Sequence, residues 1–256
     1  MACLAACATP QRPLAETEAP DIVLFVTDAA DSAQAVSLLA PEGVHFLHGF
    51  ASADDPGAVL TALLTSHWPG ATGAPDSIPG VLGLYGFRSA AWLRPGLAVD
   101  PTVARHFTTA LDVAEAGARA EAAAAWLADA PEPFLLVVDV DAAGITRVRE
   151  GLARRGLRDR TLTLLVGAVG DDAPMVLLHP RMPAESRGVV DPAPCSTMDV
   201  LPTLVVAGGG TAPSDVQGLV LRGTGDPARV VFRVNADGSL EARSAAAHLR
   251  VGSATT

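Results

Sequence analysis

The chain has 256 residues and a net charge of −10, with 28 acidic residues against 18 basic ones. All of the basic residues are arginine, so Schiff-base chemistry and a P-loop lysine are excluded. Hydrophobic residues make up 49% and charged residues 18% of the chain, which excludes a fully disordered protein. The acidic balance argues against nucleic acid as the main partner. No apolar run reaches the ~18 residues that a membrane-spanning helix needs.

Apolar runs and helix signals alternate along the sequence. Continuous apolar runs predict strands buried on both faces, and periodic or alanine-rich segments that end at Pro or Gly predict helices. In chain order we expect a strand at 22–27, a helix at 32–39, a strand at 44–50, a helix at 58–66, a loop at 69–83, a helix at 110–130, a strand at 134–140, a helix at 145–155, strands at 161–166 and 175–178, a helix at 198–207 and a hairpin of strands 230–234 and 240–243. This order predicts an α/β fold, with a mostly parallel sheet, helices on both faces and a C-terminal β-hairpin.

The first 20 residues are predicted to form a tail before a single domain of residues 21–256. Leu4-Ala5-Ala6-Cys7 is similar to a bacterial lipobox, in which Cys7 is the lipid anchor, and the Pro-, Ala- and Glu-rich stretch after it suits a flexible tether. Only six residues precede Cys7, so this interpretation requires a start upstream. It predicts a protein on the periplasmic side of a bacterial cell envelope, without a transmembrane helix. The alternative is a short disordered tail on a cytoplasmic protein.

Acidic residues that follow extended segments are the main candidates for a site. Asp28 comes directly after the first predicted strand, at the carboxyl end where open α/β sheets bind ligands. Asp31, Asp54–Asp55 and Asp171–Asp172 also follow extended segments, and clustered carboxylates can hold Ca²⁺ or Mg²⁺. The alternative for Asp28 and Asp31, which we favour, is capping of the helix that follows them.

Histidine and cysteine spacing gives no metal motif. His45 and His48 lie in an extended segment, where residues three apart point to opposite faces, so ordinary packing is favoured for both. The chain has three cysteines and no C-x-x-C spacing, which argues against a disulfide framework and against cysteine-bound zinc.

Several segments match known sequence blocks in the same order. They are Pro20–Asp28, Gly43–Phe46, Ala62–Pro69 with Thr72-Gly73, Tyr85–Ala90, Ala125–Leu127 with Pro133–Leu135, Gly156–Leu162, Pro174–Leu177 with Met198–Leu204, and Ala242–Leu249. In this order the chain resembles the sulfatase family, within the alkaline-phosphatase-like superfamily. The resemblance spans nearly the whole chain. It implies that family's α/β fold and a metal-dependent site for hydrolysis of sulfuric or phosphoric esters.

The residues of the implied site do not carry over. The resemblance places the family's nucleophile at Pro56, its motif proline at Ala58 and its arginine at Leu60. The family's two adjacent metal aspartates fall on Asp28 and Ala29, so Asp28 is left as a vestigial metal ligand. Formylglycine, the family's nucleophile, cannot be made from proline.

The later parts of the implied site are also missing. The family's Asp-His metal pair falls on Ala168–Val169, the histidine of its D-P-H segment falls near Ala143, and its active-site lysines are absent. One carboxylate is a weak site for a divalent cation that prefers about 6–8 oxygens. Without the metal, the arginine and the lysines, nothing stabilises charge developing on a sulfuryl or phosphoryl group.

The sequence therefore predicts a pseudoenzyme with a binding or assembly role at the bacterial cell envelope. The expected partner is an anionic glycan or another envelope protein, with no cofactor beyond residual Ca²⁺ or Mg²⁺. One alternative is a divergent metal-dependent ester hydrolase whose rebuilt site uses Asp28, Asp31 and Asp171 with a water nucleophile. Another is a decaying paralogue without a role of its own.

Overall fold

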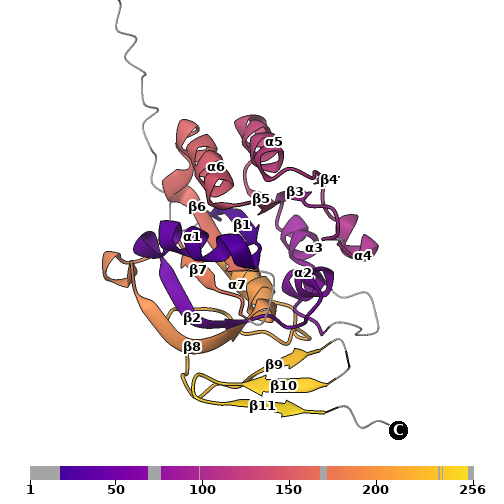
Figure 1. The fold of residues 1–256 in the computed structure, drawn as a ribbon. Helices are drawn as coiled ribbons and strands as arrows, with labels where there is room; N and C mark the ends of the chain where they lie inside the picture. Colours follow the sequence, from indigo (N-terminus) through magenta and orange to yellow (C-terminus); the bar gives the residue numbers. More distant parts are fainter. Residues whose placement is uncertain are drawn as a thin grey trace, which may run out of the picture.

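The computed structural model describes residues 18–68, 76–97, 99–167, 172–235, 237 and 239–252. Its centre is an eight-stranded sheet with the order β4-β3-β5-β1-β6-β7-β2-β8 (Figure 1). The strands are β1 (Asp21–Thr27), β2 (Val44–Phe50), β3 (Arg88–Leu93), β4 (Thr109–Asp112), β5 (Phe134–Asp139), β6 (Thr161–Gly167), β7 (Met175–Leu178) and β8 (Val190–Ser196). Neighbouring strands are parallel except where β7 pairs with β6 and β2. The expected mostly parallel α/β fold is confirmed.

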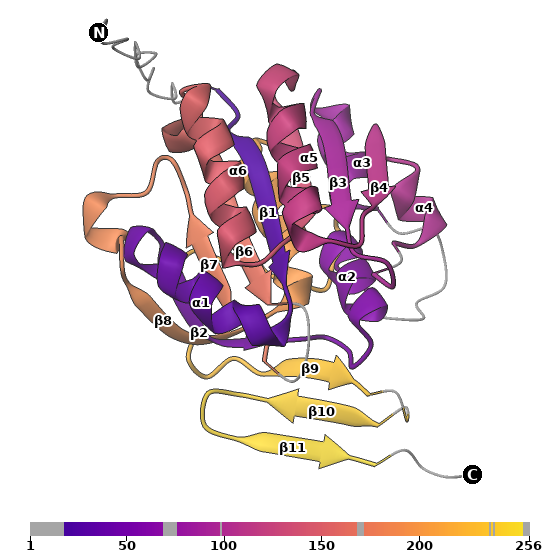
Figure 2. The same cartoon turned by 45° about the horizontal axis from the view of Figure 1, so that its top comes forward.

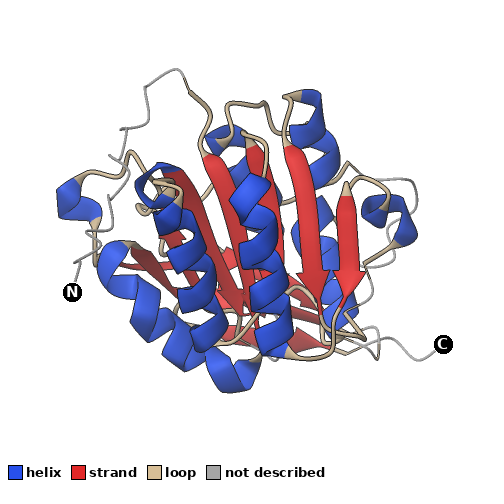
Figure 3. Cartoon of the chain, turned by 90° about the horizontal axis from the view of Figure 1, so that it is seen from above, coloured by secondary structure: helices blue, strands red, loops and turns tan. Residues whose placement is uncertain are grey.

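Helices cover both faces of this sheet. Figure 2 shows α1 (Ala29–Leu39), α6 (Ala142–Arg154) and α5 (Ala116–Asp129) side by side across one face, and Figure 3 shows the same layer from above. The other face is covered by α2 (Pro56–Thr65), α3 (Ile78–Leu84), α4 (Pro101–Ala104) and α7 (Val200–Ala207). Successive residues of a strand point to opposite faces, so β1 sends Leu24 into one apolar cluster and Phe25 into the other. Among the described residues, no helix combines the length and apolar character needed to cross a membrane.

The expected loop at 69–83 is wrong in its last part, and residues 69–75 lie outside the described residues. The helix α3 begins at Ile78, where the Ser77 hydroxyl accepts a hydrogen bond from the amide of Gly80 at 3.3 Å. Pro79 is tolerated in the first turn, where its missing N–H costs nothing. Burial of Ile78 and Leu82 in the core outweighs the poor helix propensity of the glycines.

The helix expected at 110–130 is wrong in its first part. Residues 109–112 form β4, which pairs in parallel with β3, and α5 begins only at Ala116. The alanine content of the segment favours a helix, but pairing with the strand edge offers the backbone an equivalent set of hydrogen bonds. Leu111 lies in this edge strand and is 53% exposed, so it is not part of a buried helix face.

The strand β8 carries no clear sequence signal because it contains Pro192 and Pro194. The sheet order places β8 at an edge, with β2 as its only neighbour in that sheet. Proline is tolerated at an edge because the missing N–H can be on the side without a partner strand.

A second, antiparallel sheet lies below the main one (Figure 1). The expected hairpin is confirmed as β9 (Val231–Val234) and β10 (Leu240–Arg243), and β11 (His248–Val251) adds a third strand. The sheet is joined to the segment before α2 by a bridge between Ala53 and Val234 and by an ion pair between Asp54 and Arg233.

Candidate functional site

Three adjacent parallel strands end beside one another and carry the candidate site. The order β3-β5-β1 places their carboxyl ends at one edge of the sheet. Asp139 is the last residue of β5, Asp28 follows β1, and Arg94 follows β3. This is the edge at which open α/β sheets bind ligands.

The guanidinium of Arg94 lies between the two carboxylates. Its Nη1 is 3.1 Å from Oδ2 of Asp28, and its Nε is 3.2 Å from Oδ2 of Asp139. The backbone amide of Arg94 also donates to Oδ2 of Asp139, at 3.2 Å. One arginine therefore joins the ends of all three strands.

A second arginine completes the cluster from the helix layer. Nη2 of Arg119, in α5, lies 3.2 Å from Oδ2 of Asp139, and its Nε donates to the Asp139 carbonyl at 2.5 Å. Its Nη1 donates to the carbonyls of Val113 and Ala114, both at 2.6 Å. Arg119 and Asp139 are buried, so this pair is neutralised with little help from water, whereas Arg94 and Asp28 are partly exposed.

The pKa values in this cluster follow from burial and from the two arginines. Burial raises the pKa of Asp139, and the charges of Arg94 and Arg119 oppose that shift without cancelling it. Burial also acts to raise the pKa of Asp28, but the amide of Asp31 and the Arg94 guanidinium outweigh it, so that pKa is lowered. The pKa of Asp31 is raised by burial and then by the negative charges of Asp28 and Asp141.

The donor set does not fit the divalent metal that the resemblance implies. Oδ1 of Asp28 accepts the amide of Asp31 at 3.0 Å and Oδ2 holds Arg94. Oδ2 of Asp139 receives both arginines. A hard divalent cation needs about six or more oxygens with free lone pairs, and the described part of the chain contains no cluster of three or more His, Cys, Asp or Glu side chains with metal-binding geometry.

Asp28 also caps a helix, as expected. Because its carboxylate accepts the Asp31 amide, α1 begins at Ala29, earlier than the predicted Ser32. Asp31 lies inside the first turn rather than at the cap. A carboxylate in the first turn is still stabilised by its interaction with the helix dipole. Ala29, in the position of the family's second metal aspartate, is exposed.

The segment that matches the family's nucleophile motif forms the start of α2. Pro56 is the first residue of the helix, Ala58 is half-buried, and Leu60 is fully buried in the core. The nearby hydroxyl of Ser52 accepts a hydrogen bond from Thr197 at 2.9 Å, and both residues are fully buried. The start of this helix therefore offers neither a nucleophile nor an arginine.

Asp55 is the N-cap of α2, since its carboxylate accepts the Ala58 amide at 2.8 Å. We expect Asp55→Ala to lower the free energy of unfolding by about 1 kcal/mol and Asp55→Asn by clearly less, because asparagine also caps. Urea titration of both variants measures this difference. Equal losses in the two variants would contradict a capping role.

The structure separates the remaining predicted residues. Asp54 is paired with Arg233 of the small sheet, Asp172 is exposed, and Ala143 is exposed on α6. Cys195 is buried, with its Sγ 3.7 Å from the Met175 sulfur. Cys7, Ala168–Val169 and Asp171 lie outside the described residues.

A groove of about 540 Å³ begins at Ala29, next to the cluster, and runs between α1 and β2. His45 and His48 both line it, although residues three apart in a strand were expected to face opposite sides. The pairing of β2 with β8 is irregular between Phe46 and His48, which disturbs the alternation. Asp172 and Phe50 lie on the same groove.

Sequence reasoning missed Arg94, Arg119 and Asp139. Asp139 ends the apolar run 134–138, which is the same signal that singled out Asp28. Arg94 lies one residue beyond β3 and four beyond the end of the Tyr85–Ala90 match, so extending that match to the end of the strand would have found it. Arg119 carries no such signal, because it lies within the alanine-rich helix.

The fold and the edge cluster define an α/β architecture with the strand-end carboxylates neutralised by arginine. No profile of a known protein family matches the sequence, and no curated protein is significantly similar to it. Solved structures are similar. The putative sulfatase yidJ from Bacteroides fragilis matches with a TM-score of 0.73 at 15% identity, over 92% of this chain and 86% of that one.

Two further structures support the same assignment. The phosphonate monoester hydrolase of Agrobacterium radiobacter has a TM-score of 0.69 at 13% identity, over 91% of this chain and 89% of that one. BT4656 in complex with its substrate D-glucosamine-2-N,6-O-disulfate has a TM-score of 0.71 at 12% identity, over 89% and 87%. The chain thus has the alkaline-phosphatase-like fold of sulfatases and phosphonate monoester hydrolases.

Proposed function

We propose that this chain is a sulfatase-like protein that has lost catalysis and acts by binding. The observation that carries the proposal is the position of Arg94, whose guanidinium forms ion pairs with Oδ2 of Asp28 and Oδ2 of Asp139. A cation supplied by the chain itself then neutralises the strand-end carboxylates, and ester hydrolysis is left without a Lewis acid. Pro56 and Leu60, in place of a nucleophile and an arginine, support the same conclusion.

The groove beside the cluster is the binding surface in this proposal. It presents hydrogen-bonding side chains from His45, His48, Ser32 and Asp172 together with the ring of Phe50. Such a mixture suits a carbohydrate, which needs both hydrogen-bond partners and a flat apolar contact. BT4656, which shares the fold, is complexed with a sulfated sugar, so an anionic glycan is the ligand that we propose, and another envelope protein is the second choice.

The proposed place of action is the bacterial cell envelope, with Cys7 as the lipid anchor. The support is the Leu4-Ala5-Ala6-Cys7 sequence and the tether-like stretch that follows it. Labelling of cells with a radioactive fatty acid tests the anchor, with Cys7→Ser as the unlabelled control. Equal labelling of both proteins, or of neither when the upstream sequence is included, counts against it.

A divergent hydrolase with a rebuilt metal site is the competing function. It would need Asp28 as a ligand, and that carboxylate is committed to Arg94 and to the cap of α1. We therefore favour the binding role over hydrolysis.

Metal addition and ester hydrolysis decide between the two functions. We expect millimolar Ca²⁺, Mg²⁺ or Mn²⁺ to leave the unfolding midpoint of the protein unchanged, whereas a ligand at one hundred times its Kd would stabilise the fold by about 2.7 kcal/mol. We also expect no metal-dependent release of nitrophenol from its sulfate, phosphate or phosphonate esters. A midpoint shift that disappears in Asp28→Ala, together with turnover, would establish the hydrolase instead.

A further inference from the structure

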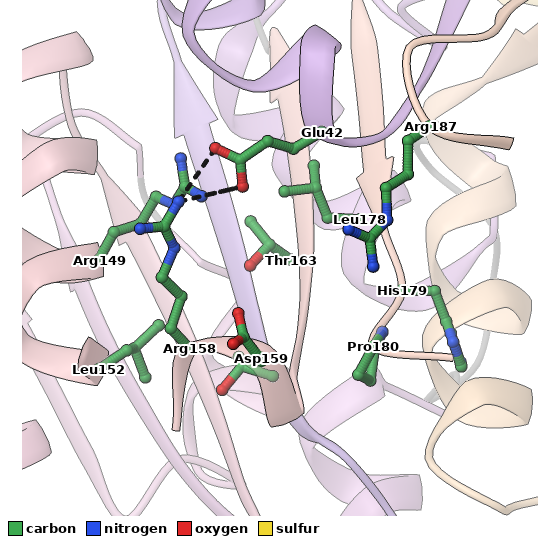
Figure 4. Close-up of a pocket in the computed structure, with 11 residues that line it drawn as sticks. Glu42, Arg149, Leu152, Arg158, Asp159, Thr163, Leu178, His179, Pro180 and Arg187 are labelled. Atoms are coloured by element: carbon green, nitrogen blue, oxygen red, sulfur yellow. Dashed lines mark hydrogen bonds and ion pairs between the residues drawn. The ribbon is translucent and has the colours of Figure 1, made fainter. Parts of the chain in front are cut away.

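A second cavity lies at the other end of the sheet, away from the candidate site. It has a volume of about 270 Å³ and lies among η1 (Ala40–Glu42), α6, η2 (Arg158–Arg160) and the segment after β7 (Figure 4). Thr161 and Thr163, at the amino end of β6, line it. The candidate site lies at the carboxyl ends of the strands, so the two sites are separate.

The lining of this cavity is rich in charged side chains. Its lining includes three arginines and two acidic residues, in a chain whose net charge is −10: Arg149, Arg158, Arg187, Glu42 and Asp159. The cavity is therefore positive on a negative protein, which favours entry of an anion.

Glu42 holds two of these arginines together. Nη2 of Arg149 donates to its Oε2 at 2.5 Å, and Nη2 of Arg158 lies 3.1 and 3.2 Å from its two oxygens. Burial acts to raise the pKa of Glu42, but the two arginines outweigh it and keep the pKa below its usual value, so the carboxylate is ionised at neutral pH. Glu42 and Asp159 together balance the two guanidinium charges of this wall, so the excess positive charge of the lining comes from a third arginine.

The opposite wall supplies a third cation. Figure 4 shows Arg187 across the cavity from Arg149 and Arg158, with Thr163 between the two walls. Within the ranges that the structure describes, the guanidinium of Arg187 has no hydrogen bond or ion pair, and neither has the carboxylate of Asp159. Both groups are exposed and thus available to a ligand.

His179 supplies one more donor, because a hydrogen bond to its ring fixes which nitrogen carries the proton. The backbone amide of Arg181 donates to Nδ1 of His179 at 3.0 Å, so the neutral ring carries its proton on Nε2. Burial, and then the charge of Arg181, lowers the pKa of His179, which keeps the ring neutral at physiological pH. His179 lines the cavity beside Arg187.

We infer that this cavity binds the phosphate or sulfate group of a small ester, held between the Arg149–Arg158 pair and Arg187. Guanidinium groups match the oxygens of such anions in pairs, and the resulting hydrogen bonds are strengthened by charge. Asp159 is placed to accept a hydrogen bond from a hydroxyl of the esterified alcohol. The volume is just below the range of about 300–1,000 Å³ that ligand pockets span, which suits a monosaccharide ester rather than a longer chain.

Isothermal titration of the full chain tests the inference at a constant ionic strength set with chloride. The ligands are inorganic phosphate, inorganic sulfate, glucose 6-phosphate and glucose 6-sulfate. We expect one of the two sugar esters to bind more tightly than its inorganic anion, and the difference between the phosphate and sulfate series identifies the group. Arg187→Gln should weaken binding by about tenfold or more, and Glu42→Gln, which removes the competing carboxylate, should tighten it.

Arg154→Gln is the matched control. Arg154 is exposed in the last turn of α6 and does not line the cavity, so its loss changes the net charge equally. Circular dichroism confirms that each variant is folded. Equal weakening by Arg187→Gln and Arg154→Gln would show a general effect of net charge and overturn the site, as would the absence of binding heat for all four ligands at millimolar concentration. Neither result bears on the proposed loss of catalysis, which concerns the opposite edge of the sheet.

Discussion

Replacing Arg94 with alanine is expected to lower the free energy of unfolding by about 3 kcal/mol at neutral pH, because it leaves the buried carboxylate of Asp139 with one arginine and the partly exposed carboxylate of Asp28 with none. The figure is at the lower end for a broken buried pair, since the Arg94 side chain is 27% exposed. The loss should shrink as the pH falls. Without Arg94 the folded-state pKa of Asp139 rises further, so its protonation favours the folded variant at low pH.

Addition of a divalent cation is a second test of the role of Arg94. In Arg94→Ala, Oδ2 of Asp28 loses its guanidinium and Oδ2 of Asp139 keeps only Arg119. Ca²⁺ should therefore raise the unfolding midpoint of the variant although it leaves that of the wild type unchanged. Urea and thermal unfolding with and without Ca²⁺ measure both effects. Arg88→Ala is the control, because Arg88 is exposed at the other end of the same strand. A variant as stable as the wild type would refute the role given to Arg94.

Asp21→Asn is expected to stabilise the protein at pH 8 by about 3 kcal/mol, and to change its stability little near pH 4. Burial raises the pKa of Asp21 from 3.8 to about 7, with a smaller contribution from the charge of Glu132. A raised folded-state pKa means that stability is fully present below pH 3.8 and is lost as the pH rises through 7. Asparagine removes this loss and keeps the oxygen that accepts the Phe134 amide at 3.2 Å.

Urea unfolding at a series of pH values between 4 and 8.5 measures this effect. The wild type should lose stability relative to Asp21→Asn as the pH rises from about 4 to 7, and the difference should level off above pH 7. Asp129→Asn, at the exposed end of α5, removes the same charge without the burial and should follow the wild type. Parallel curves for the wild type and Asp21→Asn would rule out a buried Asp21 that titrates near neutrality.

Local sequence signals were sufficient for most of the inner strands. The runs at 22–27, 134–140, 161–166 and 175–178 correspond to β1, β5, β6 and β7, because a strand covered on both faces must be apolar throughout. The segment expected at 44–50 corresponds to β2, which is only partly buried. The local signals failed at the edges, where β4 looks like part of a helix and β8 contains two prolines. Edge strands bury less, so their sequences are less constrained.

By itself the sequence determined the α/β class, the cap at Asp28 and the lack of lysine, since these depend on residues close together in the chain or on composition. That Pro56 and Leu60 replace a nucleophile and an arginine stays a prediction from the resemblance. Only the tertiary structure decided which group neutralises the negative charges of Asp28 and Asp139. Arg94 is 66 residues from Asp28 and 45 from Asp139. These three residues meet because the sheet order is β3-β5-β1, and strand order is set by packing of the whole core, which no local pattern records.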